Sequence, residues 1–392
     1  MTTIYLIRHA EAEGNLYRRV HGWYDSLITD NGYRQIAALA GRFAGVHIDA
    51  VYSSDLFRTM TTAGAIYRTH GLELHTRPDL REIGVGVWED TPWGELARRD
   101  GERLWQFNHA SPDFQVAGGE TFAQVQGRML AAVQDMARAH PGQTVAAFSH
   151  GTAIRCLQAA VRGLGPGEMD GLGHSDNTGV TCLEVEEDGS CRLVFENDST
   201  HLPEEISTLA RQRWWKSKES SLADANLWFR PLDLEGEEDT YLSARREAWV
   251  DIHGPDIPFD GAAFLADARR CWEQDRQKAI VAAMLGDRLA GLLQLDLERW
   301  AEEGVGYIPF VYMTPGYRKK GLGVQLIGQA VSTCRPLGRD RLRLRCAPDN
   351  GVAQRFYQKY GFTKVGETAG SGGVPLDLLE KYIGFTPRYE VL

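Results

Sequence analysis

Five polar residues in the first half of the chain have the side-chain types that phosphoryl transfer uses. Arginine forks bind phosphate oxygens through paired hydrogen bonds, and a neutral histidine can attack phosphorus and hold the group covalently. A second histidine can stabilise charge on the phosphoryl oxygens, and a carboxylic acid can protonate the leaving oxygen. The candidates for these tasks are Arg8, His9, Arg58, Glu82 and His150.

The elements around these residues predict that they converge. Apolar runs at 3–7, 49–54, 72–77 and 144–149 are typical of buried strands, and they alternate with glycine-terminated helical patterns at 31–45, 56–71 and 120–142. This alternation predicts a mostly parallel α/β sheet covered by helices on both faces, which a hairpin over 178–198 closes. Ligands bind at the carboxyl ends of such strands, where the five side chains lie.

A second anion site is predicted in the other half of the chain. A strand at 307–313 runs into a basic glycine turn, and a helix follows at 324–334. Backbone N–H groups at a helix N-terminus bind anions, and Gly321 and Gly323 allow close approach of the backbone. Arg318, Lys319 and Lys320 add positive charge. Taken alone, the turn fits a basic surface loop equally well.

The elements of this second half come in a different order. Strands are predicted at 226–232, 278–285, 289–298, 307–313 and 341–347, and helices at 237–254, 260–275, 324–334 and 351–361. Strands that follow one another with fewer helices between them indicate an α+β domain. Arg341, Arg343 and Arg345 share one face of the last strand, and that face is expected to be solvated.

Length and composition limit the alternatives. The 392 residues are enough for two or three domains, and the net charge of −10 argues against nucleic acid as the main partner. No apolar stretch approaches the ~18 residues that would span a bilayer, so a cytoplasmic location without membrane attachment is expected. The six cysteines show no metal-binding spacing, which indicates reduced thiols.

Residues 204–226 form a polar segment with a basic, tryptophan-rich middle. We expect a helical linker whose tryptophans dock on a neighbouring domain. The alternative is a patch that binds a membrane surface or nucleic acid, which the acidic chain and the shortness of the segment disfavour.

The first half resembles the histidine phosphatase superfamily in its phosphoglycerate-mutase-like branch. The resemblance covers residues 1–203 and rests on Arg8-His9 with Asn15, on "HGWYDSLITDNG", "SSDLFRTMTTA", "LREIGVGVWED", "GGETFAQVQGRM", "SHG" and "NDSTHL". It implies a three-layer fold with His9 as the nucleophile that becomes phosphohistidine and Glu82 as the proton donor. It further implies a phosphoryl-binding set made of Arg8, Asn15, Arg58 and His150.

Two departures from the family pattern bear on function. Ala10 and Ala12 replace the usual glycine and threonine, which removes a hydroxyl near the pocket. The stretch between Glu82 and Gly118 is also short, whereas mutases of the family carry a longer insertion there. A phosphatase that acts on small phosphomonoesters is therefore favoured, and a mutase is the alternative.

The remaining histidines of this half receive no catalytic role. We expect packing or surface positions for His21, His47, His70 and His75. His174 and His201 lie in loops near the closing hairpin and could reach the pocket.

The second half resembles the GNAT-type acetyltransferase family over residues 227–392. The turn Arg318–Gly323 meets that family's glycine signature, and a second motif follows in the helix after the next strand, with Asn350, Ala353, Phe356, Tyr357, Gly361 and Phe362. The resemblance implies acetyl-CoA as co-substrate and a small primary amine as acceptor. Tyr357 would protonate the departing thiolate, and Glu302 and Glu303 are candidate bases, although solvated turn positions suit them better.

The same resemblance implies where acetyl-CoA would lie. The pyrophosphate would rest on the turn, and the pantetheine arm would follow the strand at 307–313. The implied cofactor-binding residues are Val311, Met313, Arg318, Lys319, Lys320, Gly321, Gly323, Val324 and Asn350.

The sequence thus predicts a phosphatase domain, a linker at 204–226 and an acetyltransferase domain, and neither mechanism needs a metal. A second domain that senses acyl-CoA without catalysis is the alternative, because its base is not evident. The oligomeric state stays open, with a homodimer as one alternative.

Overall fold

The computed structural model describes residues 1–211, 225–370 and 374–385. The chain divides into two compact units. The front unit comprises Met1–Thr91 and the described residues from Leu96 to 211, and the back unit comprises Pro92–Glu95 and the described residues from 225 to 385. Most of the predicted linker at 204–226 falls on residues 212–224, which lie outside the described residues.

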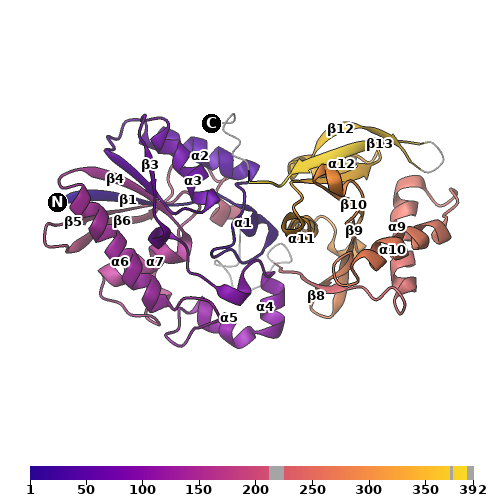
Figure 1. Cartoon of the computed structure of the whole chain (residues 1–392), viewed down its shortest axis with the longest axis horizontal. Coiled ribbons are helices and arrows are strands. Elements are labelled where there is room, and N and C mark those ends of the chain that lie inside the picture. Colours follow the sequence, from indigo (N-terminus) through magenta and orange to yellow (C-terminus); the bar gives the residue numbers. More distant parts are fainter. Residues whose placement is uncertain (212–224, 371–373, 386–392) are drawn as a thin grey trace. The chain divides into compact units, whose positions relative to one another are not determined.

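The front unit is built on a six-stranded sheet with the order β3-β2-β4-β1-β5-β6 (Figure 1). Strands β1 to β4 are parallel, and the hairpin β5–β6 continues the sheet antiparallel to β1. The mostly parallel sheet predicted from the sequence is confirmed. The strands are Thr2–Arg8 (β1), Ala50–Ser53 (β2), Leu74–Thr76 (β3), Thr144–Ser149 (β4), Val180–Val185 (β5) and Cys191–Asp198 (β6).

Helices cover both faces of this sheet, which gives the expected three layers. The pair α2–α3 packs on one face and the pair α6–α7 on the other (Figure 1). Thr121 begins α6 with a capping box, because its hydroxyl accepts from the backbone of Gln124, whose side chain bonds back. The long helices are Asp30–Phe43 (α2), Phe57–Tyr67 (α3), Phe122–Ala139 (α6) and Gly151–Val161 (α7).

Four shorter helices complete the front half. They are Glu13–Tyr17 (α1), Trp93–Arg99 (α4), Gly101–Asn108 (α5) and Thr208–Arg211 (α8). Helices α4 and α5 were not predicted from the sequence, and they occupy the stretch that follows Glu82.

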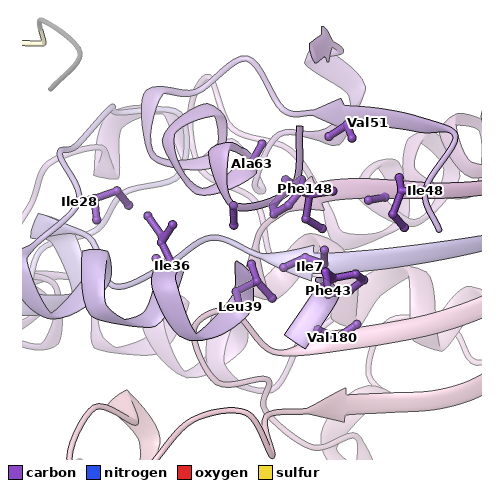
Figure 2. Packing of buried hydrophobic residues seen from close by; sticks show 14 of the residues in the cluster. Ile7, Ile28, Ile36, Leu39, Phe43, Ile48, Val51, Ala63, Phe148 and Val180 are labelled. Atoms are coloured by element: carbon purple, nitrogen blue, oxygen red, sulfur yellow. The ribbon is translucent and has the colours of Figure 1, made fainter. Parts of the chain in front are cut away.

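An apolar core beneath α2 and α3 holds the strand ends in place. Ile36, Leu39 and Phe43 recur at helical spacing on α2 and lie against Ile7 of β1 and Phe148 of β4 (Figure 2). All five side chains are at most 1% exposed. Burying each contributes about 1.5–3 kcal/mol, so the carboxyl ends of β1 and β4 sit on a rigid base.

The back unit is built on a seven-stranded sheet with the order β12-β13-β11-β10-β9-β8-β7. Its only parallel pair within the described residues is β10–β11, which confirms the predicted α+β class. Strands β12 and β13 were not predicted. The strands are Trp228–Pro231 (β7), Ile280–Leu285 (β8), Arg288–Asp296 (β9), Val305–Met313 (β10), Arg341–Cys346 (β11), Thr363–Ala369 (β12) and Pro375–Tyr382 (β13).

Strands β10 and β11 separate part-way along their length. Their pairing runs from Val305–Arg341 to Ile308–Leu344 and stops there, while β10 continues to Met313 against β9. The register of β10 against β9 shifts between Tyr307 and Phe310, which marks a bulge at the point of separation. Beyond Ile308, one side of the β10 backbone has no strand partner within the described residues.

Helices α9 and α10 pack on the sheet face that carries Phe310 and Tyr312, and Met313 points to α11 on the other face. None of the described helices is both long and apolar enough to cross a membrane. All six cysteines are free thiols, and Cys182 pairs with Phe195, not with Cys191, across the hairpin. The helices of this unit are Glu238–His253 (α9), Gly261–Gln274 (α10), Val324–Cys334 (α11) and Gly351–Lys359 (α12).

Candidate functional site

His9 lies at the carboxyl end of β1 and is held there through its backbone. Its N–H donates to the carbonyl oxygen of Ser149 on β4 at 3.0 Å. The side-chain amide of Asn177 donates to the His9 carbonyl oxygen at 2.9 Å. His9 is 2% exposed, so the residue is almost completely buried.

The protonation of the His9 ring follows from its neighbours. Nδ1 lies 2.7 Å from the carbonyl oxygen of Ala10, and because a carbonyl can only accept, Nδ1 carries the proton. Burial, reinforced by the charges of Arg58 and Arg8, holds the pKa of His9 well below its usual range. The ring is therefore neutral at physiological pH, with its lone pair on Nε2.

Arg58 lies in the first turn of α3, as predicted, and is fully buried. Its guanidinium donates to the carbonyl oxygens of Tyr24 at 3.0 Å and Gly22 at 2.6 Å, and it reaches Nδ1 of His150 at 3.1 Å. These bonds fix the guanidinium plane beside the histidines. Burial lowers the pKa of Arg58, although an arginine stays charged.

His150 follows β4 and forms the N-cap position of α7. Since Arg58 donates to Nδ1, the His150 proton sits on Nε2, which lies 3.0 Å from the hydroxyl of Ser54. The rings of His9 and His150 are 5.2 Å apart between centroids. Burial and the charge of Arg58 lower the pKa of His150 well below its usual range, so both rings are neutral beside two permanent cations.

Arg8 completes the cationic side of the site. Its Nη1 donates to the carbonyl oxygen of Ser175 at 2.5 Å. A Cβ on Gly151 would come within 3.2 Å of Arg8 Nε, so a larger residue there would crowd the guanidinium. The Nε atoms of Arg8 and Arg58 are both buried without a hydrogen-bond partner among the described residues. Such unused donors are suited to an anion.

Glu82 meets the same edge of the sheet through the N-terminus of α7. Its carboxylate accepts from the backbone N–H groups of Thr152 at 3.1 Å and Ala153 at 2.9 Å. Its charge acts on both Arg8 and Arg58. The structure therefore brings the carboxylate, both histidines and both arginines together, as the sequence predicted.

The Asn15 side chain bonds to the backbone at the start of α1. Its Oδ1 accepts from the backbone N–H of Ala12 at 3.1 Å and so closes the first turn of α1. For an anionic ligand, which accepts hydrogen bonds, the side chain offers its Nδ2 donors.

The back unit presents its glycine turn in a conformation suited to an anion. Gly321 has φ +78° and Lys319 has φ +58°, so the turn uses left-handed backbone. A Cβ on Gly323 would lie 3.2 Å from the ring of Phe356. Lys319, Lys320 and Gly321 are exposed, and Val324 begins α11 as a buried residue.

Arg318 differs from the two lysines, because acidic residues of α9 already pair with its side chain. Its guanidinium binds Asp251 at 2.6 Å and Glu247 at 2.5 Å, and its Nε donates to the Met313 carbonyl oxygen at 2.7 Å. These contacts tie the turn to α9. They leave positive charge at the turn mainly to Lys319 and Lys320.

The remaining predicted cofactor residues lie around the strand separation. Val311 and Met313 pair with β9 and stand on the part of β10 that β11 does not reach. Asn350 caps α12, since its side chain accepts from Ala353 N–H at 3.1 Å. These features fit acetyl-CoA. The glycine turn and its exposed lysines suit the pyrophosphate. The side of β10 that has no strand partner among the described residues suits the pantetheine arm.

Tyr357 and the two glutamates complete the predicted residues of this unit. Tyr357 is half-buried on α12, and burial, with a smaller contribution from Cys346, raises the pKa of its phenol. Glu303 pairs with Arg343 at 3.3 Å and is 54% exposed. That position matches the solvated turn expected for it.

Comparisons with known proteins agree with this arrangement. Residues 4–199 match the histidine phosphatase superfamily (branch 1), and residues 244–362 match the acetyltransferase (GNAT) family. "Probable phosphoglycerate mutase GpmB" of Cronobacter sakazakii (strain ATCC BAA-894) is 33% identical over 164 residues, which are 42% of this chain and 76% of that protein. The protein of the same name from Yersinia pestis (strain Pestoides F) is 34% identical over 164 residues, which are again 42% of this chain and 76% of that protein.

A solved structure supports the same assignment. "Bacillus stearothermophilus YhfR" superposes with a TM-score of 0.50 and 32% identity, over 51% of this chain and 99% of its own. The chain belongs to the histidine phosphatase superfamily. Its back unit carries a GNAT acetyltransferase domain.

One further histidine lies beside the candidate site. His21 hydrogen-bonds Ser26 at 3.2 Å, as a packing residue would, and its ring centroid also lies 5.6 Å from that of His9, a proximity that the sequence did not indicate. Burial and the charges of Arg58 and Arg8 lower its pKa well below the usual range. A Cβ on Gly14 would overlap the His21 ring at 2.3 Å, so the glycine makes room for it.

The two loop histidines have different surroundings. Burial and the charges of Arg155 and Arg8 lower the pKa of His174 to about 4, so this residue is an electrostatic neighbour of the site. His201 instead contacts Thr178 at 3.1 Å and Arg42 at 3.2 Å.

Arg128 of α6 supports the Glu82 segment and was also missed. It donates to the carbonyl oxygens of Arg81 at 2.7 Å and Glu82 at 2.9 Å. Two further bonds of 2.7 Å join it to the carboxylate of Glu120. The only sequence signal is a charged residue within a helix, which is usually a surface residue, so pattern reasoning would not have found it.

Proposed function

We propose that the front domain, residues 1–203, hydrolyses small phosphomonoesters through a phosphohistidine on Nε2 of His9. The observation that carries this proposal is the bond from Nδ1 of His9 to the Ala10 carbonyl oxygen. It leaves the lone pair on Nε2, and the depressed pKa keeps that lone pair free at neutral pH.

In the first step, the Nε2 lone pair of His9 attacks phosphorus and the bond from phosphorus to the ester oxygen breaks. Glu82, in its acid form, gives a proton to the departing oxygen, so the product leaves as an alcohol. Arg8, Arg58 and His150 hold the phosphoryl oxygens, and the Nδ2 amide of Asn15 donates to one of them. Each well-placed donor of this kind contributes about 3–4 kcal/mol to the transition state.

In the second step, water attacks the phosphohistidine. The Glu82 carboxylate, left ionised by the first step, takes a proton from that water as the bond between phosphorus and nitrogen breaks. Inorganic phosphate is released, and His9 and Glu82 return to their starting protonation states.

The names of the curated relatives favour a second candidate, the interconversion of phosphoglycerates. The short stretch between Glu82 and Gly118 argues for hydrolysis instead. Incubation with 3-phosphoglycerate separates the two: a phosphatase releases inorganic phosphate, and a mutase accumulates 2-phosphoglycerate.

The test of the proposal is the variant His9→Ala in the full chain. It should lose the acid-labile phosphoenzyme and phosphate release from a panel of phosphomonoesters. His47→Ala is the matched control, because His47 is 81% exposed and should leave both readouts unchanged. Full activity in His9→Ala would refute the assignment.

We propose in addition that the back domain, residues 227–392, acetylates a small primary amine. When bound, acetyl-CoA supplies the activated acetyl group. The turn from Arg318 to Gly323, together with Val324 and Asn350, would hold its phosphates, and the backbone of Val311 and Met313 would hold its arm. As the amine nitrogen bonds to the acetyl carbon and the carbon–sulfur bond breaks, the Tyr357 phenol, kept protonated by burial, would donate a proton to the leaving sulfur, and the proton that the amine loses would pass to solvent.

The competing function for this domain is acyl-CoA sensing without catalysis. Phosphatase assays with and without acetyl-CoA, combined with a search for an acetylated product, separate the two. Turnover to a product supports the enzyme, whereas a changed phosphatase rate without product supports the sensor.

A further inference from the structure

Two arginines of the back unit lie over the ring of Tyr307 on β10, and a third lies over the ring of Phe310 on the same strand. The guanidinium carbon of Arg299 lies 4.9 Å from the centre of the Tyr307 ring, and that of Arg345 lies 5.9 Å from it. Arg245 of α9 stacks on the neighbouring Phe310 ring at 3.9 Å and also acts electrostatically on the Tyr307 phenol. We call Arg245, Arg299 and Arg345 the arginine cluster.

Within the described ranges, no acidic side chain forms an ion pair with any member of the cluster. Arg245 donates only to neutral groups, the Tyr241 hydroxyl and the Gln294 amide oxygen, each at 2.8 Å. The guanidinium groups of Arg299 and Arg345 make no hydrogen bond to the residues described. Nε of Arg345 is buried without a partner among the described residues, and a buried donor without an acceptor is unfavourable.

Four carboxylates of this region are already paired with other arginines. Arg270 binds Asp267 at 2.8 Å and Asp296 at 2.7 Å. Arg343 binds Glu380 at 2.8 Å and Glu303 at 3.3 Å. These four carboxylates therefore do not balance the charge of the cluster, and its three like charges repel one another.

The three arginines on one face of β11 also differ in whether an acidic side chain pairs with them. Arg341 pairs with Asp340 at 3.0 Å, and Arg343 pairs with two glutamates. Only Arg345 has no acidic partner among the described residues. The solvated face expected from the sequence therefore describes Arg341 better than Arg345.

The cluster also lies beside the separation of β10 and β11. The last paired residues are Ile308 and Leu344, so Tyr307 comes just before the separation and Arg345 just after it. This is where the arm of acetyl-CoA would run under the proposed function. An anion bound by the cluster would sit close to the reacting acyl group.

We infer that the arginine cluster binds an anionic group of the acetyl acceptor, so that the acceptor is a small amine that also carries a carboxylate or phosphoryl group. Guanidinium forks suit both anions, because each presents two oxygens at the right spacing. This inference rests on the proposed acetyltransferase function and adds the class of acceptor. Arg245, Arg299 and Arg345 are specificity residues in this scheme.

The test uses the full chain with His9→Ala, so that the front domain does not hydrolyse phosphorylated amines. Acetyl transfer is measured on pairs of amines that differ in one anionic group. Glycine is compared with glycinamide, β-alanine with its amide, and O-phosphoethanolamine with ethanolamine. We expect acetylation of the anionic member only, and the pair that responds identifies carboxylate or phosphoryl as the recognised group.

Three single variants then test the residues. Arg345→Gln and Arg245→Gln should raise KM for the anionic acceptor on the order of tenfold to a hundredfold, as expected for a lost hydrogen bond to a charged group. Their Kd for acetyl-CoA should stay within about twofold. Arg341→Gln is the matched control on the same strand face and should leave KM unchanged.

The outcomes are distinguishable. A chain that does not bind acetyl-CoA refutes the proposed function and this inference with it. If acetyl-CoA binds, three results overturn the inference alone: no anionic amine is acetylated, neutral amines are acetylated equally well, or Arg345→Gln and Arg245→Gln behave like Arg341→Gln. The last result would mean that the arginines only stack on their aromatic neighbours.

Discussion

Nη2 of Arg58 lies 3.1 Å from Nδ1 of His150, and both side chains are completely buried. This contact joins the first turn of α3 to the N-terminus of α7, two elements that are 92 residues apart in the sequence. It fixes the proton of His150 on Nε2 and keeps a permanent positive charge next to the neutral His9. Under the proposed function, this fixed cation would stabilise the phosphoryl oxygens.

The first prediction concerns Arg58→Lys. Lysine keeps the charge but cannot reproduce the planar fork that reaches Tyr24, Gly22 and His150. We expect kcat/KM for a phosphomonoester to fall on the order of a hundredfold, which corresponds to about 2.7 kcal/mol of transition-state stabilisation. Arg81→Lys, at a pair with Asp55 that is partly exposed, should change kcat/KM less than about twofold.

The second prediction concerns the titration of the site histidines. His9, His21 and His150 have depressed pKa values, so they should stay neutral as the pH falls through about 6.5, where an unperturbed histidine is half protonated. Nitrogen chemical shifts in the histidine-labelled full chain test this directly. Titration of all three near 6.5 in the folded chain would contradict the electrostatics described above.

A change in stability follows from the same shifts. Below about pH 6.5 the three histidines bind protons in the unfolded chain but stay neutral in the folded chain. The free energy of unfolding should therefore fall as the pH falls. Each buried histidine contributes up to about 1.4 kcal/mol per pH unit in this window. His21→Gln should therefore flatten the fall in melting temperature between pH 7 and 5.5, whereas His47→Gln should not. Equal slopes in the two variants would count against burial of His21 as a neutral ring.

The third prediction concerns Glu82→Gln, which removes the proposed proton donor. Alkyl phosphates have poor leaving groups and need that proton, whereas p-nitrophenyl phosphate does not. We expect kcat to fall about a hundredfold or more for alkyl esters and much less for the nitrophenyl ester. Equal losses on both substrates would show that Glu82 has a different role.

The fourth prediction concerns Arg128→Gln. Arg128 does not touch the substrate, but it holds the carbonyl oxygens of Arg81 and Glu82. Loosening of that segment should reproduce, in weaker form, the leaving-group dependence of Glu82→Gln. Arg138→Gln on the same helix, which removes an exposed pair with Asp135, is the control. A uniform loss on all esters would point to a merely structural role for Arg128.

The fifth prediction concerns Gly321→Ala in the back domain. Gly321 has φ +78°, which costs an alanine about 1–2 kcal/mol. We expect weaker binding of acetyl-CoA, by about tenfold, because the turn must give up the conformation that presents its N–H groups. Gly316→Ala is the control, since a Cβ there meets no atom within 4 Å. Calorimetric titration measures both, and an unchanged Kd for Gly321→Ala would contradict a role of this turn in binding.

Much of the fold could be read from local patterns. Apolar runs that alternate with glycine-terminated helices predicted strands β1 to β4 and their parallel direction. This was possible because a buried strand and an amphipathic helix each have their own periodicity. Strands β12 and β13 were missed. Residues 363–369 are largely polar, and residues 375–382 mix leucines with charged residues, so β13 is defined by its pairing between β11 and β12. Pairing with distant strands is not written in local periodicity.

The sequence by itself determined the residue types of both sites and the edge of the sheet at which Arg8, His9 and His150 meet. The alternation of strands and helices along the chain predicts this sheet edge, and the short motifs identify the residue types. Only the tertiary structure decided which of them are neutral, which donors lack a hydrogen-bond partner among the described residues, and that His21 lies beside His9 while Arg128 holds the Glu82 segment. It also separated Arg345 from the ion-paired Arg341 and Arg343. The reason is physical: protonation and charge balance depend on burial and on neighbours from distant segments, and these exist only once the chain has folded.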